Sequence, residues 1–183
     1  MAARAVPAPL AQLPNALTVF RLALIPVFVV LMIQAGDAPS WPAGIVFGIA
    51  GVTDQIDGFL ARRWHVESRF GKIADPLADR LMIDAAVILL CVYGRLPWIA
   101  LVVIVARDTL LIVGYRVLHP RGVEIEVSLL GKAATWLLYA AIAFRIVTAD
   151  STTWPLWLFW IGLGGAVVAA ALYARDAWKV IRR

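Results

Sequence analysis

Four aspartates in a short stretch of an otherwise apolar chain are the residues best placed to do chemistry. Asp54 and Asp57 are three positions apart, and Asp75 and Asp79 are four apart, so each pair projects from one face of its own helix. If those two helices face each other, the four carboxylates converge on one small volume. An all-oxygen cluster of this kind suits hard cations, so we expect two divalent ions, Mg²⁺ or Mn²⁺, with positions left for phosphate oxygens.

The residues after the first pair favour a phosphate-bearing ligand. Gly58 and Ala61 continue the face of Asp57, and both are too small to fill a groove, so a bulky ligand can approach the backbone there. Arg62 offers a planar fork of donors suited to a phosphate. The alternative is that the acids are ordinary ion-pair partners in a helix bundle, which explains their charge but not the small residues beside them.

The whole pattern is similar to a known family signature. From Asp54 to Asp79 the chain reads D-x-x-D-G-x-x-A-R-x8-G-x-x-x-D-x-x-x-D, which resembles the signature of the CDP-alcohol phosphatidyltransferases at every fixed position. The stretch Pro14 to Leu22 resembles the first helix of that family, over a shorter match. The resemblance implies transfer of a phosphatidyl group from CDP-diacylglycerol to an alcohol, with release of CMP.

The resemblance also implies roles for individual residues. Asp54, Asp57 and Asp75 would be the chief metal ligands, and Asp79 would be both a metal ligand and the general base for the acceptor hydroxyl. The CDP moiety would be bound by an overlapping set: Asp54, Asp57, Gly58, Ala61 and Arg62. Within that set the small residues would accommodate the cytidine, and the arginine would hold the diphosphate.

More distant segments bear on the acceptor alcohol. Arg107-Asp108 and the run from Ser128 to Thr135 resemble the glycerol-type branch of the family, which includes phosphatidylglycerophosphate synthases and the cardiolipin synthases of the same fold. The acceptor phosphate would be bound by basic residues: Arg107, Arg116, Arg121 and Lys132. For Arg116 and Arg121, an ordinary snorkelling cation at the membrane interface is an equal alternative.

Three positions favour phosphatidylglycerol over glycerol 3-phosphate as the acceptor. The phosphatidylglycerophosphate synthases that the chain resembles tend to carry Glu in place of Asp108, Lys in place of Arg80 and a second Lys in place of Ala134. Glycerol 3-phosphate is a phosphomonoester dianion, which requires more positive charge than the monoanionic diester of phosphatidylglycerol. We therefore expect a cardiolipin synthase, with a phosphatidylglycerophosphate synthase as the alternative.

The elements that must position these residues are expected to be membrane helices. Of the 183 residues, 62% are hydrophobic and 16% charged, and the mean hydropathy of +0.84 lies outside the range of ordinary soluble domains. Without a linker, low-complexity tract or fixed-period repeat, residues 1–183 are expected to form a single domain. We predict an all-α integral membrane protein of six transmembrane helices with a short N-terminal surface segment. The spans are expected at 17–33, 43–63, 71–93, 98–118, 127–147 and 154–173.

Two local signals refine this picture of the helices. Arg21 and Pro26 interrupt the first apolar run, and no small-x-small cleavage site follows it, so we expect a retained span and not a signal peptide. Ser40 is a candidate N-cap for the second span, with Pro42 near the first helical position.

The basic residues indicate the partners and the orientation. The net charge is +5, but the Lys and Arg residues lie at the ends of apolar segments and form no single polar face, which favours membrane lipids over nucleic acid. Six spans would place both termini on one side, together with twelve of the 17 Lys and Arg residues, while Arg95 and Arg145 fall opposite. The positive-inside rule then predicts that both termini and the active site face the cytoplasm at the inner membrane.

Two other classes of membrane protein would explain part of the pattern. An ion or proton carrier also has carboxylates within its bundle, but carriers bind near the midplane with broken or repeated helices, and neither feature is present in the sequence. A non-enzymatic membrane subunit would need no metal cluster. Metal-dependent release of CMP from CDP-diacylglycerol would separate the enzyme from both. The family resemblance further suggests a homodimer.

Overall fold

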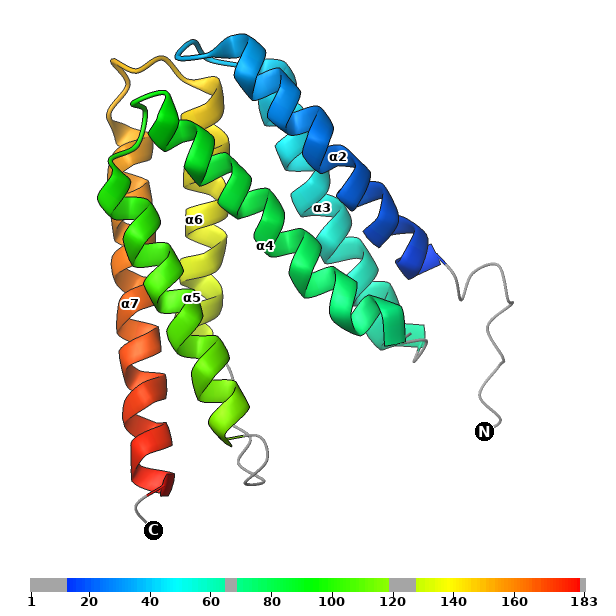
Figure 1. Cartoon of the computed structure of the whole chain (residues 1–183), viewed down its shortest axis with the longest axis vertical. Helices are drawn as coiled ribbons and strands as arrows, with labels where there is room; N and C mark the ends of the chain where they lie inside the picture. Colours follow the sequence, from blue (N-terminus) through cyan, green and yellow to red (C-terminus); the bar gives the residue numbers. More distant parts are fainter. Residues whose placement is uncertain (1–12, 65–68, 119–127, 182–183) are drawn as a thin grey trace.

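The computed structural model describes residues 13–64, 69–118 and 128–181, and these stretches form helices joined by short turns, with no strand among them. Side chains are described except at 13–15, 55, 57–79, 113, 115–118 and 176–181. Consecutive helices run in opposite directions (Figure 1). The all-helical prediction is confirmed, and the helices are α2 (Leu13–Ala35), α3 (Trp41–Trp64), α4 (Arg69–Val92), α5 (Trp98–Leu118), α6 (Leu129–Val147) and α7 (Trp154–Ile181).

The helix ends follow local signals in the sequence. Ser40 caps α3 as predicted, because its Oγ accepts a hydrogen bond from the backbone N–H of Ala43 at 3.2 Å. Gly36, directly after α2, has a φ of 61°, the left-handed conformation that commonly terminates a helix. The helix itself continues to Ile181, whereas the last apolar span was predicted to end at residue 173. The apolar run stops there, but the Ala, Arg and Lys residues that follow retain good helix propensity.

Aromatic rings and small residues hold the helices together. The ring of Phe47 on α3 lies 5.8 Å from that of Phe28 on α2 and 5.0 Å from that of Tyr139 on α6, measured between centroids. On its other side α6 packs closely on α7, where a Cβ built at Gly165 would lie 3.3 Å from the Cβ of Ala134. Helices in membranes approach through small residues of this kind.

The turns at one end of the bundle are tied together by a buried arginine. Arg95, in the turn between α4 and α5, donates hydrogen bonds to the carbonyl oxygens of Ala38 and Ile146 at 3.3 Å and of Thr148 at 2.5 Å. Arg145 of α6 donates in return to the carbonyl oxygen of Arg95 at 2.9 Å. The turns after α2, α4 and α6 therefore form one unit at the upper end of Figure 1.

This arginine pair is costly to bury. Desolvation by burial, and then the charge of Arg145, lower the pKa of Arg95 from its ordinary value, while Asp150 and Asp37 oppose the shift. Asp150 lies 3.8 Å from Nε of Arg95 and also forms an ion pair with Arg145. Removing either arginine would leave backbone carbonyl oxygens of the α6–α7 turn without their donors.

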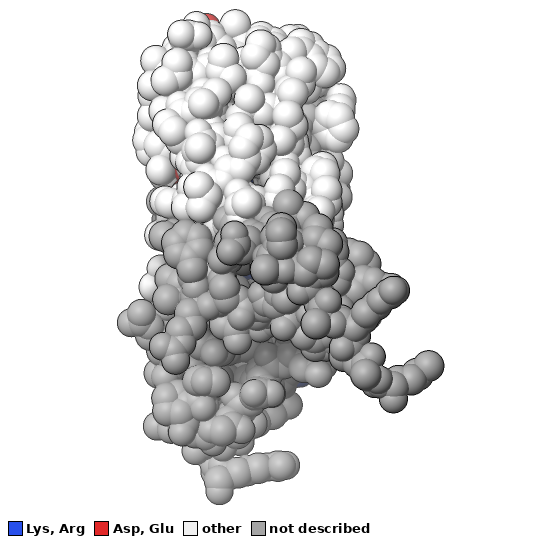
Figure 2. Space-filling model, turned by 90° about the vertical axis from the view of Figure 1, so that its right-hand side faces the viewer, with Lys and Arg blue, Asp and Glu red and all other residues white. Residues whose placement is uncertain are grey.

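The outer surface is that of a membrane protein. Among the described residues, three helical segments are long and apolar enough to cross a bilayer: Ala16–Ala35, Leu129–Val147 and Trp154–Arg175. Large apolar side chains that a water-soluble domain would bury are exposed, including those of Val30, Ile45 and Ile161. The described part of the face in Figure 2 is almost free of charged atoms.

Candidate functional site

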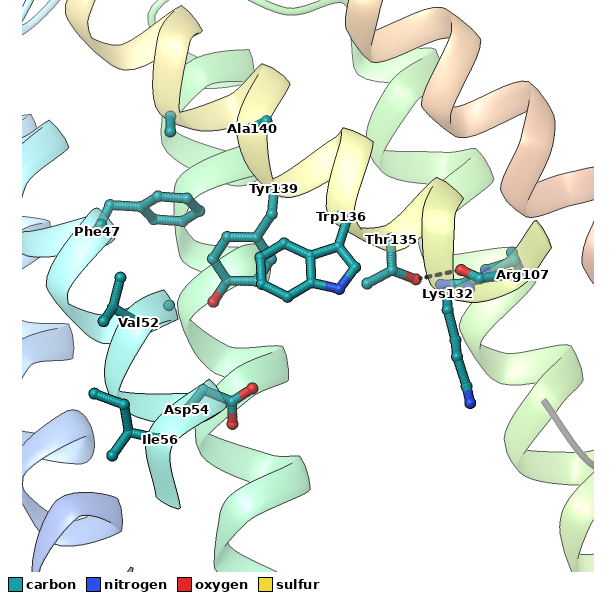
Figure 3. Close-up of a pocket in the computed structure, with 14 residues that line it drawn as sticks. Phe47, Val52, Asp54, Ile56, Arg107, Lys132, Thr135, Trp136, Tyr139 and Ala140 are labelled. Carbon is teal, nitrogen blue, oxygen red and sulfur yellow. Dashed lines mark hydrogen bonds between the residues drawn. The ribbon is translucent and has the colours of Figure 1, made fainter. Parts of the chain in front are cut away.

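A cavity of about 640 Å³ lies between α3 and α6, with one residue of α5 in its wall. One part of the wall is apolar and includes Phe47, Gly48, Tyr139, Ala140 and Ala143. The other part is polar and contains Asp54, Arg107, Lys132 and Thr135 (Figure 3). A cavity with both kinds of wall can hold a molecule that has an apolar and a charged portion.

Asp54 connects this cavity to the predicted metal site. It is carried by α3 and points into the cavity (Figure 3), and its side chain is 26% exposed. One of its oxygens, Oδ1, accepts a hydrogen bond from Nη1 of Arg21 at 2.6 Å. Arg21 belongs to α2 and is completely buried, so the first helix and the second are joined by an ion pair at the position where the aspartate pattern begins.

Two predicted acceptor-binding residues share the cavity with Asp54. Arg107 of α5 and Lys132 of α6 lie across the cavity from it (Figure 3). Nη1 of Arg107 donates to Oδ1 of Asp108 at 3.0 Å, which limits the positions that the guanidinium can adopt. The turn that carries Lys132 is fixed by Ser128, whose hydroxyl caps α6. The structure thus brings together residues that are 25 to 78 positions apart.

The other predicted site residues lie only partly within the described structure. α3 carries Asp57, Gly58, Ala61 and Arg62, and α4 carries Asp75 and Asp79, so the helical spacing assumed for both pairs is correct. Their side chains, that of Arg116 and all of Arg121 lie outside the described residues. Among the side chains that are described, no three His, Cys, Asp or Glu form a group able to hold a metal. The metal, CDP and catalytic assignments therefore stay predictions.

The three positions that favoured phosphatidylglycerol make contacts with neighbouring helices. Arg80 of α4 and Asp108 of α5 form an ion pair, with 3.2 Å between Nη1 and Oδ2. These two positions therefore belong to a single contact between α4 and α5, and Asp108 also accepts a hydrogen bond from Arg107. Ala134 is buried against Gly165 of α7, away from the cavity that Lys132 lines. Its lack of charge therefore carries no information about the charge in the cavity.

The apolar part of the cavity was not predicted from the sequence. Gly44, Gly48 and Gly51 recur along α3 at spacings of four and three, the pattern by which membrane helices approach each other. Their surroundings differ: a Cβ at Gly51 would lie 2.8 Å from Cε1 of Tyr139 and one at Gly44 would overlap Val147, whereas Gly48 has no atom within 4 Å of that position. The spacing was available in the sequence, but which glycine stays open depends on the partner helix.

The chain is similar to known proteins over most of its length. The model of the family described as CDP-alcohol phosphatidyltransferase matches residues 11–170. A CDP-diacylglycerol–glycerol-3-phosphate 3-phosphatidyltransferase of Bacillus subtilis (strain 168) is 31% identical over 93% of this chain and 97% of its own length. The protein of the same name from Escherichia coli (strain K12) is 32% identical over 79% of this chain and 91% of its own length.

Proposed function

Because this chain belongs to the CDP-alcohol phosphatidyltransferase family, we propose that it transfers a phosphatidyl group from CDP-diacylglycerol to glycerol 3-phosphate and releases CMP. Family membership makes the chain an enzyme of phospholipid synthesis, and the alternatives of an ion carrier or a non-enzymatic subunit are wrong. The single observation that carries the choice of acceptor is the likeness, over most of both chains, to relatives that are named for glycerol 3-phosphate.

This proposal replaces the expected cardiolipin synthase. Phosphatidylglycerol was expected because a positive charge is missing at position 134, but Ala134 is buried against α7 and does not line the cavity. Two cations, Arg107 and Lys132, line the same cavity as Asp54. A phosphomonoester dianion is suited to such a pair of donors, and we assign its binding to them.

The donor set fits divalent cations. Four carboxylates at helical spacing on α3 and α4 are hard oxygen ligands, and the described member, Asp54, lines a cavity that also has room for a substrate. Asp54, Asp57, Asp75 and Asp79 would hold two ions, Mg²⁺ or Mn²⁺. When bound, such ions neutralise the charge of a diphosphate and make CMP a better leaving group.

The protein's own residues would then orient the reactants. Arg62 would hold the diphosphate, while Gly58 and Ala61 leave space for the cytidine beside α3. Asp79 would accept the proton of the glycerol 3-phosphate hydroxyl as that oxygen attacks the phosphorus. Arg107 and Lys132 would fix the acceptor at its phosphate, so that its hydroxyl is directed toward the reacting phosphorus.

The apolar part of the cavity supports a lipid donor. Phe47, Gly48 and Ala140 offer no hydrogen-bonding side chain there, Tyr139 adds a single hydroxyl, and Gly48 leaves open space beside α3. We assign this part to an acyl chain of CDP-diacylglycerol, whose charged end would reach the aspartates. A site of this kind must lie near a membrane surface, because the nucleotide comes from water and the acyl chains stay in the bilayer.

We extend the membrane assignment to all six helices. α3 and α4 have 24 residues and α5 has 21, and about 20 residues are enough to cross the hydrocarbon core. Six crossings would place both termini and the aspartates on the same side, which the distribution of Lys and Arg assigns to the cytoplasmic face of the inner membrane. A homodimer stays part of the proposal on family grounds.

Purified protein in detergent–lipid micelles tests the proposal directly. CDP-diacylglycerol with Mg²⁺ is supplied with either glycerol 3-phosphate or phosphatidylglycerol, and the lipid products are identified by mass spectrometry. We expect phosphatidylglycerophosphate and CMP from the first mixture and no cardiolipin from the second. Efficient cardiolipin formation would restore the earlier expectation, and no CMP release from either mixture, with both metals tried, would refute the proposed reaction.

A further inference from the structure

Arg21 is a charged residue with no exposed surface in an otherwise apolar helix. Its relative exposure is 0%, and it belongs to the segment Ala16–Ala35 that is apolar enough to cross a membrane. A buried cation in such a helix is retained only when its partners or its function require it. None of the roles described above uses it.

Arg21 contacts a residue of the aspartate pattern. Nη1 of Arg21 lies 2.6 Å from Oδ1 of Asp54, the short distance expected of a charge-assisted hydrogen bond. Asp54 itself lines the cavity. The same carboxylate thus contacts a completely buried cation of α2 and borders the space where substrates are proposed to bind.

We infer that Arg21 is a positioning residue of the cation site, which holds the carboxylate of Asp54 in one orientation toward the cavity. This inference rests on the proposed function, because it presumes that Asp54 binds a divalent cation. A carboxylate held by a fixed donor keeps its rotamer when the cation arrives, and outer partners of this kind commonly tune metal affinity. It also gives a chemical role to the stretch Pro14 to Leu22, which the aspartate pattern alone leaves without one.

A purely structural role makes a different prediction. If the ion pair only joined α2 to α3, its loss would lower stability and leave cation binding intact. If the guanidinium acted only as a nearby positive charge, its removal would tighten cation binding, because like charges repel. Of these three roles, only holding the carboxylate in place predicts that removal of Arg21 weakens cation binding.

The chain offers a matched control in Arg95. It is also a buried arginine, at 2% exposure, but its hydrogen bonds go to backbone carbonyl oxygens of the turns after α2 and α6. It does not line the cavity, and its ion pair is with Asp150, which lies outside the aspartate pattern. Arg95→Gln therefore reports the general effect of removing a buried guanidinium.

The experiment measures Mn²⁺ binding by electron paramagnetic resonance on purified wild type, Arg21→Gln and Arg95→Gln in detergent, with and without CMP. We expect Arg21→Gln to weaken Mn²⁺ binding by about tenfold or more, while Arg95→Gln keeps the wild-type affinity and loses thermal stability. Wild-type or tighter binding in Arg21→Gln would overturn the inference. Absence of Mn²⁺ binding in wild type would instead overturn the proposed metal site, and the inference with it.

A second variant covers the case in which Arg21→Gln does not fold. Arg21→Lys keeps the positive charge, but an ammonium is a compact point charge on a different stem and lacks the planar fork of donors. We expect folded protein whose Mn²⁺ affinity lies clearly between the wild-type value and complete loss. An affinity equal to that of wild type in this variant would show that the planar fork of donors is not required, and would contradict the positioning role assigned to the guanidinium.

Discussion

Replacing Lys132 by Gln tests whether the cavity binds the acceptor through its phosphate. Gln keeps most of the aliphatic stem and removes the charge. A hydrogen bond to a charged group contributes about 1.5–3 kcal/mol, and because Lys132 is exposed at the first turn of α6, solvent screening places it at the lower end. Since about 1.4 kcal/mol is a factor of ten, we expect the KM for glycerol 3-phosphate to rise about tenfold. Arg107 would remain as the other cavity cation.

The assay is the initial rate of CMP release as glycerol 3-phosphate is varied at saturating CDP-diacylglycerol. The kcat should change little, because Lys132 is proposed to bind the acceptor equally in the ground state and in the transition state. The wild-type KM should rise with ionic strength, since the Debye length is only about 8 Å at physiological salt, and this dependence should be weaker in the variant. Arg175→Gln removes an exposed cation on α7 that does not line the cavity, and should leave the KM unchanged. An unchanged KM in Lys132→Gln would refute the assignment of this cavity wall to the acceptor.

Three further outcomes are expected. Gly48→Leu should fill the open part of the cavity, misplace the headgroup and lower kcat/KM for long-chain CDP-diacylglycerol by about tenfold or more. Gly164→Leu, at a glycine of α7 that is equally open, is the control. Equal effects at both positions would contradict the assignment of this cavity to an acyl chain. Asp79→Asn should stay folded in detergent and lose about 10²–10⁴-fold in turnover, whereas near wild-type turnover would exclude Asp79 as the base. Arg95→Gln should lower the free energy of unfolding by about 3 kcal/mol, because buried partners lose their donor. This corresponds to a fall of about 6–12 °C in the unfolding midpoint, measured by differential scanning fluorimetry. A change below about 2 °C would show that the turns are held by other contacts.

The helices could be predicted from the sequence because they depend on local signals. Apolar runs of sufficient length and the cap at Ser40 are read residue by residue, and the start of each helix lies within four residues of its predicted position. The span predicted at 154–173 is shorter than α7, which continues to Ile181, because hydropathy reports where the apolar surface stops and a helix can continue beyond that point with good helix formers.

The cavity and the acceptor could not be predicted in the same way, because both depend on which residues face each other across helices. Ala134 is charge-free for a packing reason, its contact with Gly165 of α7, and no pattern within α6 reveals that contact. Arg80 and Asp108 are separated by 28 positions and form one ion pair, so two positions that were treated as independent in the sequence contact each other across helices. The pairing of Arg21 with Asp54 likewise joins separate helices.

The turns joined by Arg95 and Arg145 lie at the end of the bundle far from Asp54, and they bear on where water-soluble molecules can enter the protein. Arg95 and Arg145 donate hydrogen bonds to backbone carbonyl oxygens there from guanidinium groups that are almost completely buried, so these carbonyl oxygens do not depend on water for their partners. The cavity wall, in contrast, includes charged residues at its other part. We therefore expect the water-soluble reactant and product to enter and leave through the charged part of the cavity.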